Sequence, residues 1–236
     1  MISIAILTTG DPISSVHELV PDFATLIRNV AAVDGASWQN FDIRNPQNLP
    51  DPHLFAAYII TGSRHSVTEF SPWMAQAAAH LRRIRDSGVG LFGICFGHQL
   101  MAWAFGGVVA INPQGYEVGC KVAQPLPADG ALPWPTRRFA VPMCHRDTVV
   151  EAPRCARVLA VTDRDSHAAL HYGNLCYSTQ FHPEFTPQVL TRYVEHFRAT
   201  LHQQGDDVDS LLAQSHDTPV AAALLHQFIR VVSDGG

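Results

Sequence analysis

The sequence predicts an α/β fold: a doubly wound, mostly parallel sheet with helices on both faces and a small antiparallel flap. Between residues 1 and 105, short apolar runs alternate with helical patterns, as a sheet covered on both faces requires. After residue 107 the apolar runs become short and closely spaced, which indicates the flap. No Gly/Ser-rich linker, charge run or internal repeat divides the 236 residues, so we expect a single domain over 1–236.

The first half of the chain supplies the parallel sheet. Buried strands are expected at the apolar runs 2–7, 38–43, 57–61 and 89–94. Helices are expected at 16–33, with Pro21 as a break or a true start, at 72–86 and at 99–105. Pro72 lies in the first turn of the second helix and Gly88 just past its end, which is the usual asymmetry of helix ends.

The second half begins with the flap. Its strands are expected at 107–124, 137–143, 147–151, 156–162, 167–172 and 175–179. Pro187 then opens a helix to about 201 and Pro219 opens another to 232, with a solvent-exposed acidic turn at 206–209. The last helix has one apolar face, which either packs on the sheet or binds a partner; it comprises Ala221, Leu224, Leu225, Phe228 and Val232.

The composition limits the class of protein and its partners. The net charge is −5 and the 16 Lys and Arg residues are mostly scattered, so nucleic acid is not an expected partner. No apolar stretch reaches about 18 residues, so a membrane partner is not expected either. The five cysteines form no C-x-x-C pair, and the N-terminus shows no secretory signal. We therefore expect a cytoplasmic protein without a metal site.

One cysteine lies between two glycines where a predicted strand becomes a helix, in the segment Gly93-Ile94-Cys95-Phe96-Gly97-His98-Gln99. Glycines at both ends of such a turn tolerate unusual backbone angles and push the middle side chain toward substrate. The start of a helix favours the thiolate form, and the N–H of Phe96 is free to bind an oxyanion. Most free cysteines are instead small buried hydrophobic residues, so this motif alone leaves both interpretations open.

A second motif lies far downstream. Ser178-Thr179-Gln180-Phe181-His182-Pro183-Glu184 places a histidine and a carboxylate two residues apart at the end of another apolar strand. In extended chain such residues face the same side, so His182 and Glu184 are expected to act together. A lone His-x-Glu is more often a surface pair. Combined with Cys95, it predicts a nucleophile, a proton carrier and an orienting carboxylate.

These motifs resemble those of class I glutamine amidotransferases, in particular the amidotransferase domain of GMP synthetase and its free-standing relatives. Three segments carry the resemblance, which covers about residues 1–200: 58–67, 93–107 and 181–184. Weaker similarity lies at 115–119 and 144–149, where relatives carry a loop that closes over bound glutamine. The chain departs from the family at Ser63, where many relatives have a second glycine, and at Arg64-His65.

The resemblance implies that the side-chain amide of glutamine, or another γ-glutamyl amide, is hydrolysed through a cysteinyl thioester with release of ammonia. Cys95, His182 and Glu184 would be catalytic, and the N–H groups of Ser63 and Phe96 would form the oxyanion hole. Gly62, Gln99, His145 and Asp147 would contact substrate, and no cofactor is implied.

Three functions remain open from the sequence. The chain could serve a synthetase subunit in trans, since it has neither a G-x-x-x-x-G-K-[ST] loop nor a Ser-Gly-Gly-x-Asp-Ser loop with which to bind ATP. It could be a free-standing γ-glutamyl peptidase or hydrolase. It could also be a pseudo-enzyme that binds a small amide or a partner without catalysis.

Overall fold

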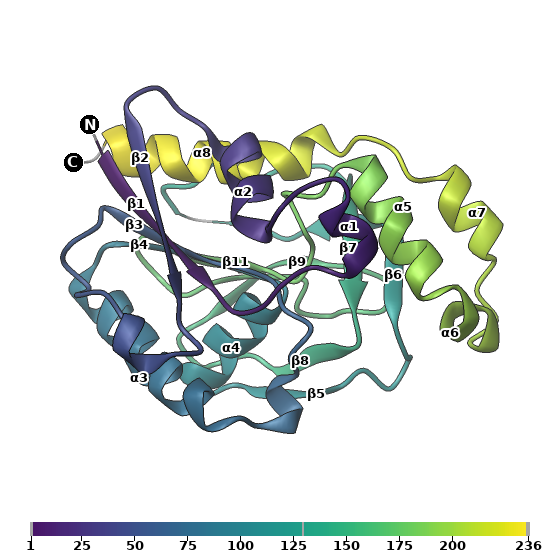
Figure 1. Ribbon diagram of the computed structural model, residues 1–236, viewed down its shortest axis with the longest axis horizontal. Helices are drawn as coiled ribbons and strands as arrows, with labels where there is room; N and C mark the ends of the chain where they lie inside the picture. The colour runs from purple at the N-terminus through teal and green to yellow at the C-terminus, as the bar shows by residue number, and fades with distance from the viewer. Residues whose placement is uncertain (1, 129, 235–236) are drawn as a thin grey trace.

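A computed structural model describes residues 2–128 and 130–234, and its centre is a nine-stranded sheet in the order β2-β1-β3-β4-β11-β10-β9-β6-β7 (Figure 1). The predicted α/β class is confirmed. The strands of this sheet are β1 (Ile2–Thr8), β2 (Ala36–Asp42), β3 (Ala57–Ile60), β4 (Gly90–Ile94), β6 (Glu117–Pro125), β7 (Phe139–His145), β9 (Arg157–Val161), β10 (Ala169–His171) and β11 (Cys176–Thr179).

The sheet has a parallel half and an antiparallel half. Strands β2, β1, β3, β4 and β11 pair in parallel, whereas β10, β9, β6 and β7 pair antiparallel. Most of the predicted flap therefore continues the main sheet by backbone hydrogen bonds. A separate two-stranded sheet is formed by β5 (Val108–Ile111) and β8 (Asp147–Glu151). The strand expected over 107–124 is wrong as a single element, because β5 and β6 belong to different sheets.

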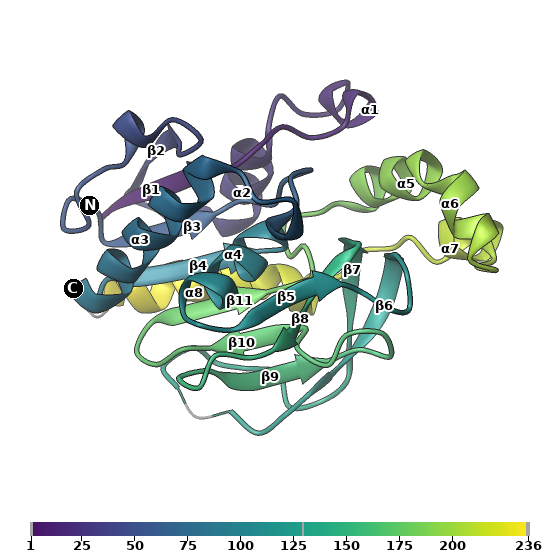
Figure 2. The same cartoon turned by 90° about the horizontal axis from the view of Figure 1, so that it is seen from below.

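Helices cover both faces of the parallel half (Figure 2). One face packs on α2 (Phe23–Ala31) and α8 (Pro219–Asp234), and the other on α3 (Pro72–Ser87) and α4 (Phe96–Ala104). Strand β1 divides its residues between them: Ile4 and Ile6 face the first pair, and Ala5 and Leu7 the second. This alternation is the two-residue period of a strand buried on both sides.

The apolar face of the last predicted helix packs on the sheet. This helix is α8, and all five of its apolar residues are buried in the core that α8 shares with α2 and the sheet: Ala221, Leu224, Leu225, Phe228 and Val232. The alternative that this face binds a partner is therefore wrong.

Two predicted helices are interrupted. The helix expected at 16–33 consists of α1 (Ser14–His17) and α2, and the carboxylate of Asp22 begins α2 by accepting a hydrogen bond from the N–H of Thr25 at 2.6 Å. The helix expected at 187–201 divides at Phe197 into α5 (Pro187–His196) and α6 (Arg198–Gln203).

The acidic turn expected at 206–209 is partly wrong. Asp207 caps α7 (Val208–Ala213), and Val208 is buried. Val208 lies between acidic residues in the sequence, but the short helix turns its side chain into the core. The charge pattern alone did not show this.

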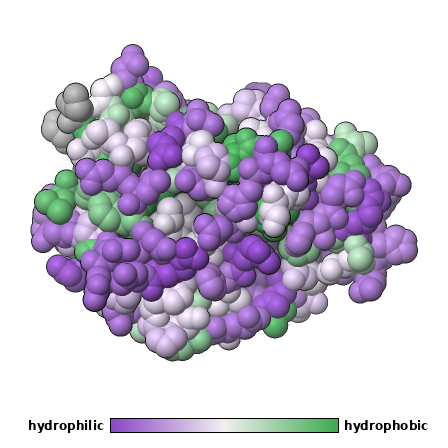
Figure 3. All heavy atoms as spheres, in the orientation of Figure 1, coloured by the Kyte–Doolittle hydropathy of each residue, from purple (hydrophilic) through white to green (hydrophobic). Residues whose placement is uncertain are grey.

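The surface seen in Figure 3 is mostly hydrophilic, with apolar atoms in small, separate areas. Among residues 2–128 and 130–234, no helix combines the length and the apolar character needed to cross a bilayer. The carboxyl ends of β1, β3, β4 and β11 meet at one edge of the sheet, where ligands bind in open α/β folds.

Candidate active site

Cys95 occupies a strained turn between β4 and α4. Its backbone has φ 50° and ψ −101°, a conformation that residues other than glycine rarely adopt. A Cβ on Gly97 would lie 2.7 Å from the carbonyl oxygen of Ile60, and one on Gly93 would lie 2.8 Å from the carbonyl oxygen of Gly97. Both glycines are therefore required by close packing, as the nucleophile-elbow motif predicts.

The turn places Cys95 in the lining of a pocket. Cys95 is only 6% exposed, and its Sγ donates to the carbonyl oxygen of Cys144 at 3.6 Å. Phe96 is the first residue of α4, so its N–H has no acceptor within the helix. This N–H is available to a ligand beside Cys95.

His182 and Glu184 form a buried pair just after β11. His182 Nδ1 donates to Glu184 Oε1 at 2.8 Å, and both residues are buried. Strand β11 lies beside β4, and the N–H of Cys95 donates to the carbonyl oxygen of Thr179 at 2.8 Å. Burial alone would lower the pKa of His182, but the Glu184 carboxylate and the neighbouring Cys95 outweigh it and raise the pKa to about 10.

An aromatic ring fixes the plane of this imidazole. The ring of Phe185 stacks on His182 with centroids 3.9 Å apart and an interplanar angle of 16°. Tyr193 and Phe23 continue the stack on Phe185, at 5.1 Å and 6.5 Å between centroids. Four nearly parallel rings from three parts of the chain thus meet beside the thiol.

The loop after β3 packs against His182 and Cys95. Thr9 holds this loop, because its Oγ1 donates to the carbonyl oxygen of Gly62 at 3.0 Å and its own carbonyl accepts from Ser63 Oγ at 2.9 Å. A Cβ on Gly62 would lie 2.9 Å from His182 Cε1. Gly62 therefore allows His182 to approach Cys95, and Ser63 lines the pocket.

Gln99 and Asp147, predicted to contact substrate, both line the pocket. Gln99 Nε2 donates to the carbonyl oxygen of Asp147 at 2.8 Å and to Gln180 Oε1 at 3.1 Å. The carboxylate of Asp147 accepts from Ser66 Oγ, and from Arg146 Nε at 3.0 Å. These polar groups hold each other and shape one wall of the pocket.

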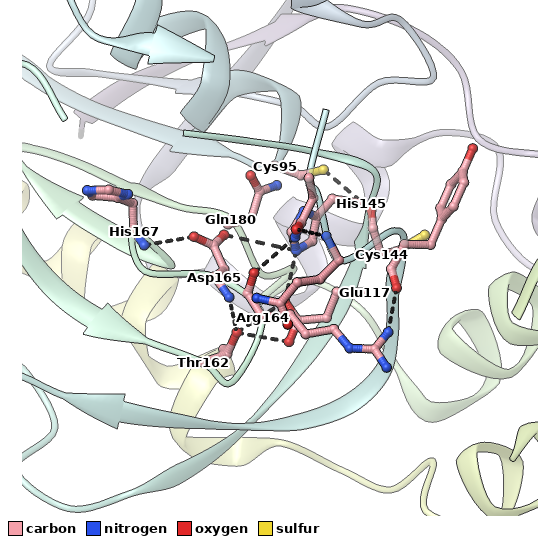
Figure 4. Close-up of polar contacts among 12 residues, drawn as sticks. Cys95, Glu117, Cys144, His145, Thr162, Arg164, Asp165, His167 and Gln180 are labelled. Carbon is pink, nitrogen blue, oxygen red and sulfur yellow. Dashed lines mark hydrogen bonds and ion pairs between the residues drawn. The ribbon is translucent and has the colours of Figure 1, made fainter. Parts of the chain in front are cut away.

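His145 also lines the pocket, but both of its ring nitrogens are engaged internally (Figure 4). Nδ1 lies 2.9 Å from the carbonyl oxygen of Asp147, and Nε2 lies 3.1 Å from Glu117 Oε2. Asp165 Oδ2 is 4.0 Å from the same nitrogen. Burial alone would lower the pKa of His145, but Glu117 and Asp165 outweigh it and raise the pKa. His145 is thus a fixed part of the wall, held through both ring nitrogens.

Sequence reasoning missed Glu117, Asp165 and the rings around His182. Weak similarity to relatives implied a closing loop at 115–119 and 144–149, whereas Glu117 and His145 are paired residues of strands β6 and β7. The aromatic residue that directly follows Glu184 was the available signal for the ring stack. Tyr193 lies on α5, the helix that directly follows Phe185, whereas Phe23 lies on α2 in the first part of the chain, so no local pattern could identify it.

The residues meet in a cavity of about 340 Å³. Within the described ranges, no group of three or more His, Cys, Asp or Glu residues is arranged to hold a metal ion. The cavity is lined by Ile13, Phe23, Ser63, Arg64, His65, Ser66, Glu69, Cys95, Phe96, Gln99, Tyr116, Cys144, His145, Arg146, Asp147, His182, Tyr193, His196 and Phe197.

A parallel sheet with a strained thiol turn, and a histidine–carboxylate pair at the end of the adjacent strand, defines an α/β protein of the nucleophile-elbow class. The family model for "Glutamine amidotransferase class-I" matches residues 38–200. The chain belongs to the class I glutamine amidotransferase family.

Relatives and solved structures agree with this assignment. The chain is 34% identical to a glutamine-hydrolysing GMP synthase subunit of Saccharolobus solfataricus, over 59% of this chain and 73% of that protein. It is 26% identical to "Gamma-glutamyl peptidase 5" of Arabidopsis thaliana, over 69% of this chain and 67% of that protein. The fold is similar to a glutamine amidotransferase crystal structure from Thermotoga maritima, with a TM-score of 0.74, 18% identity and 98% coverage of both chains.

Proposed function

We propose that this protein hydrolyses the side-chain amide of glutamine or of a γ-glutamyl compound through a cysteinyl thioester. The observation that carries the proposal is the buried His182–Glu184 pair, 2.8 Å between Nδ1 and Oε1, at the end of the strand beside Cys95. Nδ1 is committed to Glu184, so Nε2 is the nitrogen that exchanges a proton with Cys95 and with the leaving group.

The reaction has two steps. His182 takes the proton of the Cys95 thiol, as its raised pKa favours, and Cys95 Sγ then attacks the amide carbon while the N–H groups of Phe96 and Ser63 stabilise the oxyanion. The C–N bond then breaks and His182 protonates the departing nitrogen. Water, deprotonated by His182, hydrolyses the thioester, which releases the acid and restores the thiol. Glu184 keeps the imidazole oriented throughout.

Charged and polar residues on one wall suit the rest of a γ-glutamyl group. Arg64 and Arg146 line the cavity and carry the charge that an α-carboxylate requires, and Glu69 carries the charge that an α-amino group requires. Arg146 is oriented by Glu69 Oε1 at 2.9 Å. We assign Gly62, Gln99, His145 and Asp147 to this wall as the groups that shape it.

Replacing the nucleophile tests the proposal. Cys95→Ser should lose hydrolysis of glutamine and of γ-glutamylglycine, measured as glutamate release, because a hydroxyl here is a far weaker nucleophile. Cys155→Ser is the matched control, since Cys155 is exposed and lies outside the cavity lining. Equal turnover by Cys95→Ser and the parent would contradict the mechanism.

A second candidate is ammonia supply to a synthase, favoured by the similarity to a GMP synthase subunit. In that case free glutamine should be hydrolysed slowly until the synthase protein is added. Rapid hydrolysis of glutamine by the purified chain, with no gain from γ-glutamyl peptides or cell extract, would count against both a partner and a bulkier substrate.

A further inference from the structure

The cavity beside Cys95 has two chemically different sides. The polar side is built by the loop after β3 and by the β7–β8 connection: Ser63, Arg64, Ser66, Glu69 and Arg146. The apolar side is built by α2, α5 and the residues at the start of α1 and the end of α5: Ile13, Phe23, Tyr193 and Phe197, with the exposed His196 next to Phe197. Ile13, Phe23 and Tyr193 are each at least 95% buried, so this side is a packed surface.

His182 belongs to the apolar side. Its ring stacks on Phe185, which in turn stacks on Tyr193 and Phe23 at interplanar angles of 9° and 7°. A general acid must lie within hydrogen-bond reach of the nitrogen that it protonates. The departing nitrogen therefore lies beside His182, and any substituent on that nitrogen extends along the apolar side.

We propose that this side selects γ-glutamyl amides whose amine carries an apolar or aromatic substituent. The inference rests on the proposed amide hydrolysis: the S–C bond forms at Cys95, the C–N bond breaks, and the proton from the thiol passes through His182 to the amine. Water then hydrolyses the thioester, which gives glutamate and the free thiol.

Size and polarity both support this substrate class. Free glutamine releases ammonia and would leave the apolar side unfilled. A cavity of about 340 Å³ lies within the range that accommodates ligands larger than one amino acid. A charged or strongly polar substituent would lose hydration against Ile13, Phe23 and Phe197, whose side chains offer it no hydrogen-bond partner. An apolar substituent gains there instead.

Two synthetic amides test the selection in the wild-type protein. γ-Glutamylbenzylamide and γ-glutamylethanolamide release amines of similar basicity, so their rates differ through binding of the substituent. We expect kcat/KM to be about tenfold or more higher for the benzylamide. Equal values for the two amides, with hydrolysis intact, would overturn this inference and leave the proposed function standing.

Substitutions on the apolar side test whether these residues cause the preference for the benzylamide. Phe23→Leu and Phe197→Ala should each lower the benzylamide-to-ethanolamide ratio of kcat/KM severalfold. Phe41→Ala is the control, because Phe41 is a partly buried ring that packs on Phe55, with centroids 5.5 Å apart, and lies outside the cavity lining. Correctly folded Phe23→Leu and Phe197→Ala proteins that keep the full parental ratio would contradict the assignment of this side.

Binding separates this inference from the proposed function. Titration calorimetry of Cys95→Ser with each intact amide should show about tenfold tighter binding of the benzylamide. If the wild-type protein hydrolyses neither amide nor glutamine, the proposed function fails, and the calorimetric preference still decides the inference. Equal affinity of Cys95→Ser for the two amides would overturn it.

Discussion

His182 and His145 are two buried histidines in one cavity, and they differ in what their second nitrogen does. Each has a carboxylate partner, Glu184 or Glu117, and in each the partner raises the imidazole pKa against the effect of burial. His182 commits one nitrogen and keeps the other for Cys95. His145 commits both, one to Glu117 and one to the Asp147 carbonyl. Similar electrostatics thus act on one imidazole that keeps a ring nitrogen free of the carboxylate and on another that is held through both ring nitrogens.

The largest expected effect is the loss of the His182 imidazole. His182→Ala should lower kcat/KM for glutamine by about 10²–10⁴-fold, the range of general acid–base catalysis. The exposed residue His53 offers a control, since His53→Ala removes an imidazole far from the cavity lining. A His182→Ala protein with parental kinetics would remove the distinction between the two histidines.

The next largest effect is expected from a change at Glu184, the carboxylate that orients His182. Glu184→Gln should lower turnover by about ten- to ten-thousand-fold, because Glu184 Oε1 fixes the tautomer and plane of His182. Reaction of Cys95 with iodoacetamide should persist, which shows that the fold and the thiol survive. An unchanged turnover number would exclude Glu184 from the mechanism.

The equivalent change at the fixed histidine should act on stability. Glu117→Gln should lower the free energy of unfolding by about 2 kcal/mol, the size of a hydrogen bond to a charged group. Its kcat/KM should fall by far less than that of Glu184→Gln. Urea unfolding and glutamine kinetics on both variants would sharpen the comparison, and a Glu117→Gln protein with parental stability but no turnover would reverse it.

A smaller effect is the pH dependence of that stability difference. The folded-state pKa of His145 is raised, so its stabilising interaction with Glu117 is fully present below the unfolded-state pKa of about 6.5. The interaction is lost as the pH rises through the raised folded-state pKa. The difference in unfolding free energy between the parent and Glu117→Gln should therefore shrink at alkaline pH. A difference that grows with pH would show that His145 is neutral in the folded protein.

The sequence predicted the parts of the site that depend on local geometry. Gly93, Cys95 and Gly97 encode a tight turn by their spacing, and His182 and Glu184 share one side of an extended segment. The parallel sheet followed from alternating apolar runs, because each buried strand and covering helix has its own period. The structure brings these separate motifs together at the carboxyl ends of adjacent strands.

Other features depend on pairing between distant segments. Glu117 meets His145 only through the register of β6 and β7, and a one-residue shift would turn the side chains apart. Phe185 also stacks on Phe23 of α2, which lies near the other end of the chain. The division of 16–33 into two helices was visible at Pro21, whereas the break at Phe197 had no proline or glycine to mark it.

The backbone hydrogen bond from Cys95 N–H to the Thr179 carbonyl has a consequence for motion. It lies between β4 and β11, two buried parallel strands, so separating the thiol from His182 would require opening the centre of the sheet. Such opening is among the rarest fluctuations of a folded protein. Substrate entry and product exit must therefore use the surrounding loops and short helices. The amide of Cys95 should be among the slowest in the chain to exchange its hydrogen for deuterium.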